Sequence, residues 1–158
     1  MTKIVVVTGT NTDVGKTITT ASAIAATRVR APHLQVGLIK PAQTGEVAVE
    51  KNSLGYTECG DCGDVAVVRA LLGETAETPA PLPVWEGIRY PEPLAPDMAA
   101  RRAGMELWDA AHFADVIEEA ARDVDVLFVE GAGGLLVGLG EESCGAPTTL
   151  VEIAQETA

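Results

Sequence analysis

A glycine-rich loop near the N-terminus constrains the fold of this chain more than any other feature. Residues 4–7 (Ile-Val-Val-Val) are typical of a short buried strand, and the alanine-rich residues 18–30 are typical of a helix. Between them stands Gly9-Thr10-Asn11-Thr12-Asp13-Val14-Gly15-Lys16-Thr17. A strand, a glycine loop that ends in Gly-Lys-Thr and a helix are, in that order, the context of a phosphate-binding P-loop.

The N-terminus of a helix explains why such a loop binds phosphate. Its first backbone N–H groups are unpaired, and its dipole favours negative charge there. Gly9 and Gly15 let the backbone curl around a phosphate where a side chain would block it. We expect Lys16 to reach the β/γ-phosphates of a nucleotide and the Thr17 hydroxyl to hold Mg²⁺.

The spacing of the two glycines departs from the usual P-loop. Five residues separate Gly9 from Gly15, where four are usual. Either Thr10 stands where the first glycine usually stands, or the loop is one residue longer. Both interpretations indicate a subfamily of P-loop proteins rather than the common GTPase form. An ordinary strand-to-helix turn is the alternative that the flanking elements disfavour.

Length and composition are those of one α/β domain. The 158 residues suggest a single domain, and 47% of them are hydrophobic while only 4% are aromatic. A core of Val, Leu, Ile and Ala is typical of buried parallel strands. The apolar runs are of strand length, and the N-terminus passes straight into a strand without signal-peptide features. We therefore expect a cytoplasmic protein.

The charge of the chain limits its partners. The formal net charge of −12 argues against nucleic acid and anionic membranes. An acidic protein that binds a polyanion such as ATP must concentrate positive charge at that site. Among the lysines of this chain, Lys16 and Lys40 are the expected phosphate ligands, with Mg²⁺ supplying further charge.

The cysteines do not indicate a disulfide framework. There are three, Cys59, Cys62 and Cys144, which is an odd number. Cys59 and Cys62 form a lone Cys-x-x-Cys, with no second pair at metal spacing. We interpret these cysteines as incidental, and redox or metal binding stays the alternative.

Hydrophobic periodicity and turn signals predict the remaining elements. A helix over 14–30 is followed by a strand over 36–40 that Pro41 ends, a helix over 64–72, and a proline-rich extended loop over 74–96. A helix that starts at Pro96, a helix over 109–122, a strand over 124–130, a glycine turn over 131–134, a short strand or loop over 135–140 and a helix over 149–157 complete the list.

Alternating strands and helices predict a three-layer parallel α/β sheet of the P-loop NTPase type. Three strands are few for such a sheet. We therefore expect residues 1–158 to form a single P-loop α/β domain that is the N-terminal portion of a longer chain and lacks its C-terminal strands.

Three charged residues fall at or just beyond the carboxyl ends of predicted strands, where such sheets bind ligands. Lys16 follows the first strand, Lys40 ends the second, and Glu130 ends the strand over 124–130. Lys40 is expected to face the γ-phosphate, and Glu130 to reach a metal directly or through water. Asp64, at the start of a helix, is either an N-cap or a second metal carboxylate, and the residue alone leaves both open.

Four segments together resemble the dethiobiotin synthetase family. They are Thr8-Gly9-Thr10-Asn11-Thr12-Asp13-Val14-Gly15-Lys16-Thr17, Lys40-Pro41-Ala42-Gln43-Thr44-Gly45, Glu92-Pro93-Leu94-Ala95-Pro96 and Val129-Glu130-Gly131-Ala132-Gly133-Gly134. The resemblance covers nearly the whole chain. It implies ATP-dependent closure of a ureido ring on 7,8-diaminononanoate with CO₂ (bicarbonate), giving dethiobiotin, ADP and phosphate in biotin biosynthesis.

The resemblance also implies residue roles. Lys40 and Lys16 would be catalytic, and Thr17, Asp64 and Glu130 would hold Mg²⁺. Thr12, Thr44 and Pro93 would contact the substrate. The nucleotide would lie against Asp13, Val14, Gly15, Lys16, Thr17, Asp64, Glu130, Gly131 and Gly133. The family forms homodimers, and its later part, beyond residue 158, carries adenine-recognition residues. Asp13 stands where the family often has Glu, and Asn11 where it often has Asp.

Two other P-loop classes are alternatives. An amidoligase of the cobyrinic acid diamide synthase type shares the loop, but it usually carries a glutaminase domain and needs far more chain. A ParA/MinD-like ATPase switch typically has a signature lysine early in the loop, and residues 10–14 contain none. The Lys40-Pro41 motif also favours the synthetase.

Overall fold

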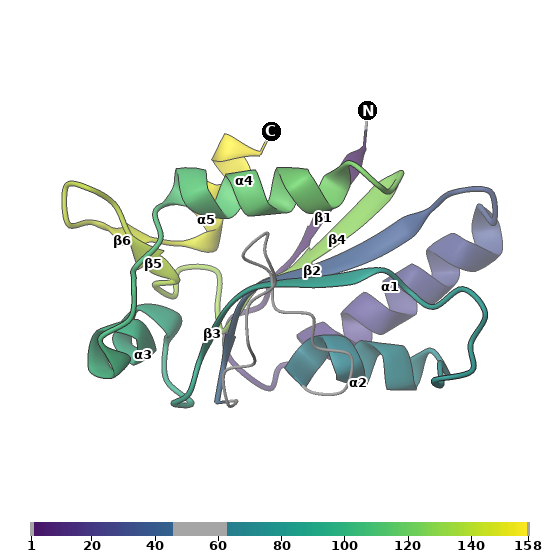
Figure 1. The fold of residues 1–158 in the computed structure, drawn as a ribbon, viewed down its shortest axis with the longest axis horizontal. Helices are drawn as coiled ribbons and strands as arrows, with labels where there is room; N and C mark the ends of the chain where they lie inside the picture. The colour runs from purple at the N-terminus through teal and green to yellow at the C-terminus, as the bar shows by residue number, and fades with distance from the viewer. Residues whose placement is uncertain (1, 46–62, 158) are drawn as a thin grey trace.

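The computed structural model describes residues 2–45 and 63–157 of the chain, and its ribbon is drawn in Figure 1. The described elements follow one another as β1 (Lys3–Val7), α1 (Lys16–Arg30), β2 (Val36–Thr44), α2 (Gly63–Leu71), β3 (Val84–Tyr90), α3 (Pro96–Ala103), α4 (Ala110–Ala121), β4 (Val126–Glu130), β5 (Gly140–Glu141), β6 (Pro147–Thr148) and α5 (Leu150–Glu156).

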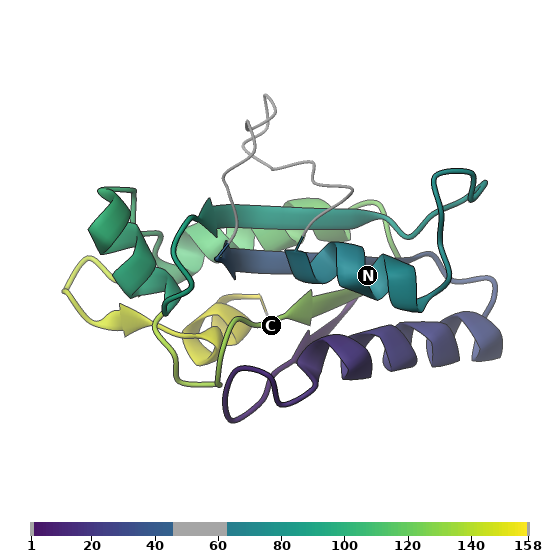
Figure 2. The same ribbon diagram turned by 90° about the horizontal axis from the view of Figure 1, so that it is seen from below.

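Four of the strands form one parallel sheet in the order β1-β4-β2-β3. Helices α1 and α2 lie on one side of this sheet, and α4 and α5 lie on the other (Figures 1 and 2). Strands β5 and β6 pair antiparallel in a separate small ribbon. The prediction of a three-layer parallel α/β sheet is confirmed.

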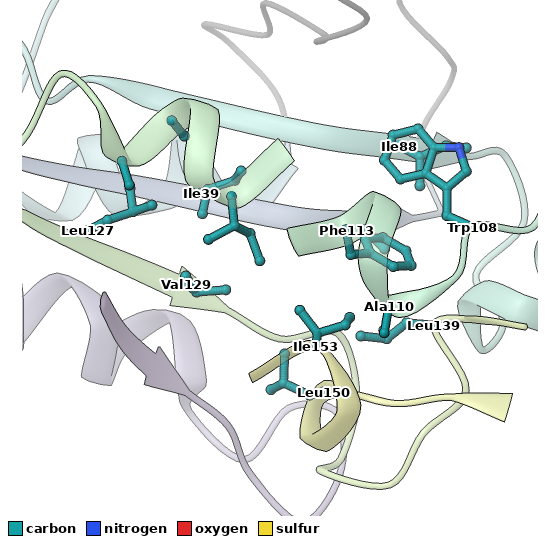
Figure 3. Close-up of a cluster of buried hydrophobic side chains, with 14 of the residues drawn as sticks. Ile39, Ile88, Trp108, Ala110, Phe113, Leu127, Val129, Leu139, Leu150 and Ile153 are labelled. Atoms are coloured by element: carbon teal, nitrogen blue, oxygen red, sulfur yellow. The ribbon is translucent and has the colours of Figure 1, made fainter. Parts of the chain in front are cut away.

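Each face of the sheet has its own core. On the α4 and α5 face, Phe113, Leu150 and Ile153 pack in one cluster with Ile39 and Leu127 of the central strands (Figure 3). On the other face, aliphatic side chains of α1 and α2 cover the sheet, among them Ile24, Val65 and Val68. Because both faces are buried, the central strand β4 is apolar at every position up to Glu130.

Local signals account for the helix boundaries. Helix α1 begins after Gly15, whose φ of 93° few other residues adopt. Helix α4 begins at the N-cap Asp109, whose side chain accepts a hydrogen bond from the His112 N–H. Helix α5 begins with a capping box, in which Thr149 and Glu152 satisfy each other's backbone N–H groups. The helices predicted from residue patterns are therefore confirmed, with bounds shifted by a residue or two.

The proline-rich region is where the prediction was wrong. Residues 74–96 were predicted as an extended loop, but Val84–Tyr90 form strand β3, and β2 continues past Pro41 to Thr44. The prolines of this region flank β3 and do not interrupt it. Pro41 is tolerated because it stands opposite Gly87: a Cβ on Gly87 would lie 2.2 Å from the Pro41 carbonyl oxygen. Because Gly87 has no side chain, β3 can lie close to the Pro41 carbonyl oxygen, and the two strands stay paired on both sides of the proline.

This proline–glycine position shifts the side-chain alternation in both strands. Ile39 and Ala42 are three residues apart, yet both lie in the core under α4. Trp85 and Ile88, also three apart, do the same on β3. An uninterrupted strand would place such pairs on opposite faces. As a consequence, Lys40 and Gln43 on β2 project toward α2. Glu86 and Arg89, which stand opposite them on β3, project to the same side.

Two further expectations from the sequence are that the cysteines are incidental and that the apolar runs are too short to cross a membrane. Cys59 and Cys62 lie outside the described residues, and Cys144 is a free, exposed thiol. Among the described residues, no helix combines the length and the apolar character needed to cross a membrane.

Candidate active site

The loop between β1 and α1 has a backbone that only particular residues permit. Gly15 and Asp13 both have positive φ, at 93° and 57°. A Cβ on Gly9 would lie 2.5 Å from Cγ2 of Val14, so the loop closes on itself at that glycine. The expected curled conformation before a helix N-terminus is present.

Lys16 bends back over this loop. Its ammonium donates a hydrogen bond to the Asn11 carbonyl oxygen at 2.8 Å, and the residue is 9% exposed. Burial lowers the pKa of Lys16, and the positive charge of Lys40 lowers it further, against the opposing effect of Glu130 and Asp64. The two lysines are thus close enough to influence one another, as expected for two cations that serve one polyanion.

Lys40 lies between two carboxylates. Its Nζ is 2.5 Å from Oδ2 of Asp64 and 3.3 Å from Oε1 of Glu130, and it donates to the Gly131 carbonyl oxygen at 3.1 Å. The Thr17 hydroxyl donates to the same Glu130 oxygen at 2.9 Å. The middle of β2, the end of β4 and the starts of α1 and α2 therefore meet at one cluster of charges. The prediction that Lys40 ends its strand was wrong, because β2 continues to Thr44, whereas Glu130 does end β4.

The oxygen atoms of this cluster fit Mg²⁺. Oε2 of Glu130 is buried and, within the part of the chain that the structure describes, has no hydrogen-bond partner. Thr17 and Asp64 add a hydroxyl and a second carboxylate. The described residues include no group of three or more His, Cys, Asp or Glu that could hold a metal by itself. Few protein ligands are typical of Mg²⁺ that is bound together with nucleotide phosphates.

A pocket of about 780 Å³ opens above the cluster. Ten of the predicted site residues line it, which are Thr12, Asp13, Gly15, Lys16, Thr17, Lys40, Thr44, Asp64, Pro93 and Gly133. Three others do not line it. Glu130 lies beneath, Gly131 offers its carbonyl oxygen to Lys40, and Val14 is half-exposed and packs on Gly9. The structure thus brings the predicted residues of five separate segments to one place.

One wall of the pocket is apolar. Pro93, Leu94, Ala95 and Pro96 line it together with Val137. Gly45 sits against this wall, since a Cβ there would lie 3.2 Å from Cβ of Pro93. The pocket therefore has a charged end at the P-loop and an apolar end at the turn after β3.

Several contributors were not predicted from the sequence. Gln43 lines the pocket, and its Oε1 accepts a hydrogen bond from the Asp64 N–H at 3.3 Å. Glu86 and Arg89 form a buried ion pair on β3, next to β2. Opposite charges among the apolar residues 84–90 were the available signal, but the sequence pattern predicts only an extended loop over 74–96.

Comparison with known proteins places the chain among relatives of one kind. A family model described as an AAA domain matches residues 3–148. The "ATP-dependent dethiobiotin synthetase BioD" of Rhodococcus jostii is 45% identical over 152 residues, which are 96% of this chain and 55% of that protein. The proteins of the same name from Saccharopolyspora erythraea and Frankia casuarinae are 46% and 45% identical, over 85% and 84% of this chain and 50% and 47% of their own length.

These matches test the family resemblance seen in the sequence, and they show how much of the relatives' length this chain covers. The resemblance to dethiobiotin synthetase is confirmed, because relatives that carry this name match over most of the chain. The chain spans about half the length of the curated relatives it matches.

Proposed function

The chain belongs to the AAA domain family, and we propose that it binds Mg·ATP at its P-loop as part of a dethiobiotin synthetase. The whole protein would close the ureido ring of dethiobiotin from 7,8-diaminononanoate, CO₂ and ATP. One observation carries the proposal: Lys40 stands in the same pocket as the P-loop lysine and the apolar wall. A phosphate-binding loop alone would support many activities, whereas a second buried lysine facing an apolar compartment suits phosphoryl transfer to a bound organic substrate.

The proposed reaction has three steps. One amine of the substrate attacks CO₂, forms an N–C bond and loses a proton, which gives a carbamate. A carbamate oxygen attacks the γ-phosphorus of ATP, and ADP leaves. The neighbouring amine then attacks the carbonyl carbon, phosphate leaves, and the ring is closed.

We assign the described residues parts in this scheme that the family resemblance implies and that their places around the pocket support. Lys16 and the backbone N–H groups after Gly15 hold the phosphates. Lys40 stabilises negative charge on the carbamate and on the transferred phosphoryl group. Thr12 and Thr44, which line the same pocket, contact the reacting end of the substrate, and Pro93 packs against its alkyl chain.

Asp64, Glu130 and Thr17 would hold Mg²⁺. The metal would neutralise phosphate charge and orient the nucleotide. The unpartnered oxygen of Glu130 supports this assignment, because burying a carboxylate oxygen without a partner is costly in the absence of a ligand.

Phosphate release tests the proposal. The chain is assayed with Mg·ATP in the presence and absence of 7,8-diaminononanoate and bicarbonate. We expect release only when both are present. Release that does not depend on the diamine would contradict the synthetase and favour an ATPase switch, and release that depends on glutamine and a carboxylic acid would favour an amidoligase.

We also propose that the whole protein is a homodimer, since the family resemblance implies one. Sedimentation of the purified protein measures this directly. A mass of 16.4 kDa at all concentrations would show that this chain is a monomer and would contradict the proposal for this form.

A further inference from the structure

Strand β3 carries a buried ion pair that the proposed reaction does not use. Glu86 and Arg89 are 1% and 2% exposed. Arg89 Nε donates to Oε2 of Glu86 at 2.5 Å, and Nη2 donates to Oε1 at 2.7 Å, so the guanidinium binds both carboxylate oxygens. Such a buried pair adds little stability over apolar residues of similar size. Its presence beside a site rich in charge indicates a role other than stability.

The register of the sheet places the pair against the site. Glu86 stands opposite Lys40, and Arg89 stands opposite Gln43. Because the alternation shifts at Pro41 and Gly87 in both strands, the four side chains project to the face that α2 covers. An ion pair between strand residues three apart depends on this shift, since regular alternation would separate them.

Both β2 residues that face the pair hold Asp64 in the first turn of α2. Lys40 Nζ is 2.5 Å from its carboxylate, and Gln43 Oε1 accepts its backbone N–H. Asp64 is therefore held at its carboxylate by the Lys40 ammonium and at its backbone N–H by the Gln43 amide oxygen.

Arg89 reaches the same point. A Cβ on Gly63 would lie 3.0 Å from Arg89 Nη2 and 3.2 Å from Gln43 Oε1. The guanidinium and the amide oxygen thus both lie close to the backbone just before Asp64, at a glycine with a φ of +77°. Burial raises the pKa of Glu86 against the opposing effect of Arg89, and the charges of Asp64 and Lys40 act on it as well. The pair is electrostatically coupled to the site, although neither member lines the pocket.

We propose that the Glu86–Arg89 pair is a positioning device for the carboxylate of Asp64. Glu86 orients Arg89, and Arg89 holds Gln43 and the start of α2 so that Asp64 points into the pocket beside Lys40. The inference rests on the proposed role of Asp64 in binding the Mg²⁺ of Mg·ATP, and it does not depend on the ring-closing reaction. Glu86 and Arg89 are positioning residues, because they act on the ligand only through Gln43 and Asp64.

The Mg²⁺ requirement for nucleotide binding tests the inference. Binding of a non-hydrolysable ATP analogue to the full chain is titrated without metal and at increasing Mg²⁺. In E86Q/R89Q, which removes both charges, we expect half-maximal binding to need about tenfold more Mg²⁺, as for the loss of groups that orient metal ligands. Binding without metal should be unchanged, because the P-loop is intact.

Two further variants refine the test. R89K keeps the charge but lacks the planar fork, so we expect a smaller increase in the Mg²⁺ requirement. Q43A removes the intermediate amide, and we expect its effect to be non-additive with E86Q/R89Q, because both act through one chain of contacts. If E86Q/R89Q does not fold, the Mg²⁺ requirements of R89K and Q43A, compared with that of the wild-type chain, decide instead.

The matched control is E119Q/R122Q. Arg122 and Glu119 are also an Arg–Glu pair three residues apart, but they are exposed at the C-terminal end of α4. This control should keep the wild-type Mg²⁺ requirement. A wild-type requirement in R89K and Q43A, or an equal loss of metal-free and Mg²⁺-dependent binding, would overturn the inference.

The outcomes also separate this inference from the proposed function. A wild-type chain that releases no phosphate with the diamine contradicts ring closure, yet the Mg²⁺ titration still decides the role of the pair. A wild-type chain whose nucleotide binding is independent of Mg²⁺ overturns the role of the pair together with that of Asp64.

Discussion

The Thr17 hydroxyl donates a hydrogen bond to Oε1 of Glu130 at 2.9 Å, although the two residues are 113 positions apart. Lys40 approaches the same oxygen atom at 3.3 Å. Strand β4 lies between β1 and β2 in the sheet, so its last residue reaches both the helix that follows β1 and Lys40 in the middle of β2. One carboxylate thereby connects the P-loop to the second lysine.

Replacing Thr17 by Val should weaken Mg²⁺-dependent nucleotide binding about tenfold, because the hydroxyl is a proposed metal ligand. The lost hydrogen bond should also cost about 1 kcal/mol of unfolding free energy. Titration of the analogue and urea denaturation measure the two effects. Thr27→Val is the control, since its hydroxyl binds the Ala23 carbonyl oxygen within the same helix. Equal Mg²⁺ dependence in the two variants would contradict the role of Thr17.

Lys40→Ala should lower the turnover of diamine-dependent phosphate release by about 10²–10³-fold, because the lysine is proposed to stabilise charge that develops during transfer. Nucleotide affinity should change far less, since Lys16 and the loop remain. Steady-state kinetics and analogue binding are compared with those of Lys3→Ala on the exposed start of β1. An equal loss of turnover and nucleotide affinity would show instead that Lys40 binds the ground state and the transition state equally well.

Gly87→Ala should destabilise the fold by about 1–3 kcal/mol, as overpacking of a close contact does. The added Cβ would lie 2.2 Å from the Pro41 carbonyl oxygen in the centre of the β2–β3 pair. Gly73→Ala provides the contrast, because that glycine has open space around it but a φ of +73°. Denaturant unfolding should rank Gly87→Ala as the more damaging. The reverse order would show that β2 and β3 do not pack this tightly at Pro41.

Stability should fall in alkaline solution because of Tyr90. Burial of its side chain, with added effects of Glu106 and Asp97, raises the pKa of Tyr90 from 10.0 to about 12. The folded chain keeps the phenol proton over a range in which the unfolded chain loses it, so this contribution is complete below pH 10 and is lost as pH rises to 12.

Tyr90→Phe isolates this effect. The wild-type protein should lose roughly 2–3 kcal/mol more than the variant between pH 9 and pH 12, as a two-unit shift requires. Urea unfolding at several pH values measures the difference. Parallel pH profiles for the two proteins would contradict the assignment to Tyr90.

Residue patterns predicted the parts of the site that depend on local backbone chemistry. The glycine loop, the Gly-Lys-Thr end and the following helix are contiguous, so their geometry is encoded within a few residues. The position of Glu130 was predictable because it ends an apolar run, and parallel strands bring their carboxyl ends to one edge. Lys40 was also expected at a strand end, but it lies in the middle of β2, beside the end of the shorter strand β4. Asp64 was ambiguous in the sequence, and only its contact with Lys40 places it in the site.

The amino-acid sequence by itself therefore determined the P-loop, the layer architecture and the charged residues that gather beside the P-loop. The tertiary structure decided the path of β2 through Pro41, the existence of β3 and the burial of Glu86 and Arg89. These features depend on Gly87 leaving room for a proline carbonyl on a neighbouring strand, 46 residues away in the chain. A proline inside a strand and opposite charges in an apolar run oppose strand formation when each is considered locally. In the folded chain, Gly87 on the neighbouring strand leaves room for the Pro41 carbonyl oxygen, and Glu86 and Arg89 neutralise each other within β3.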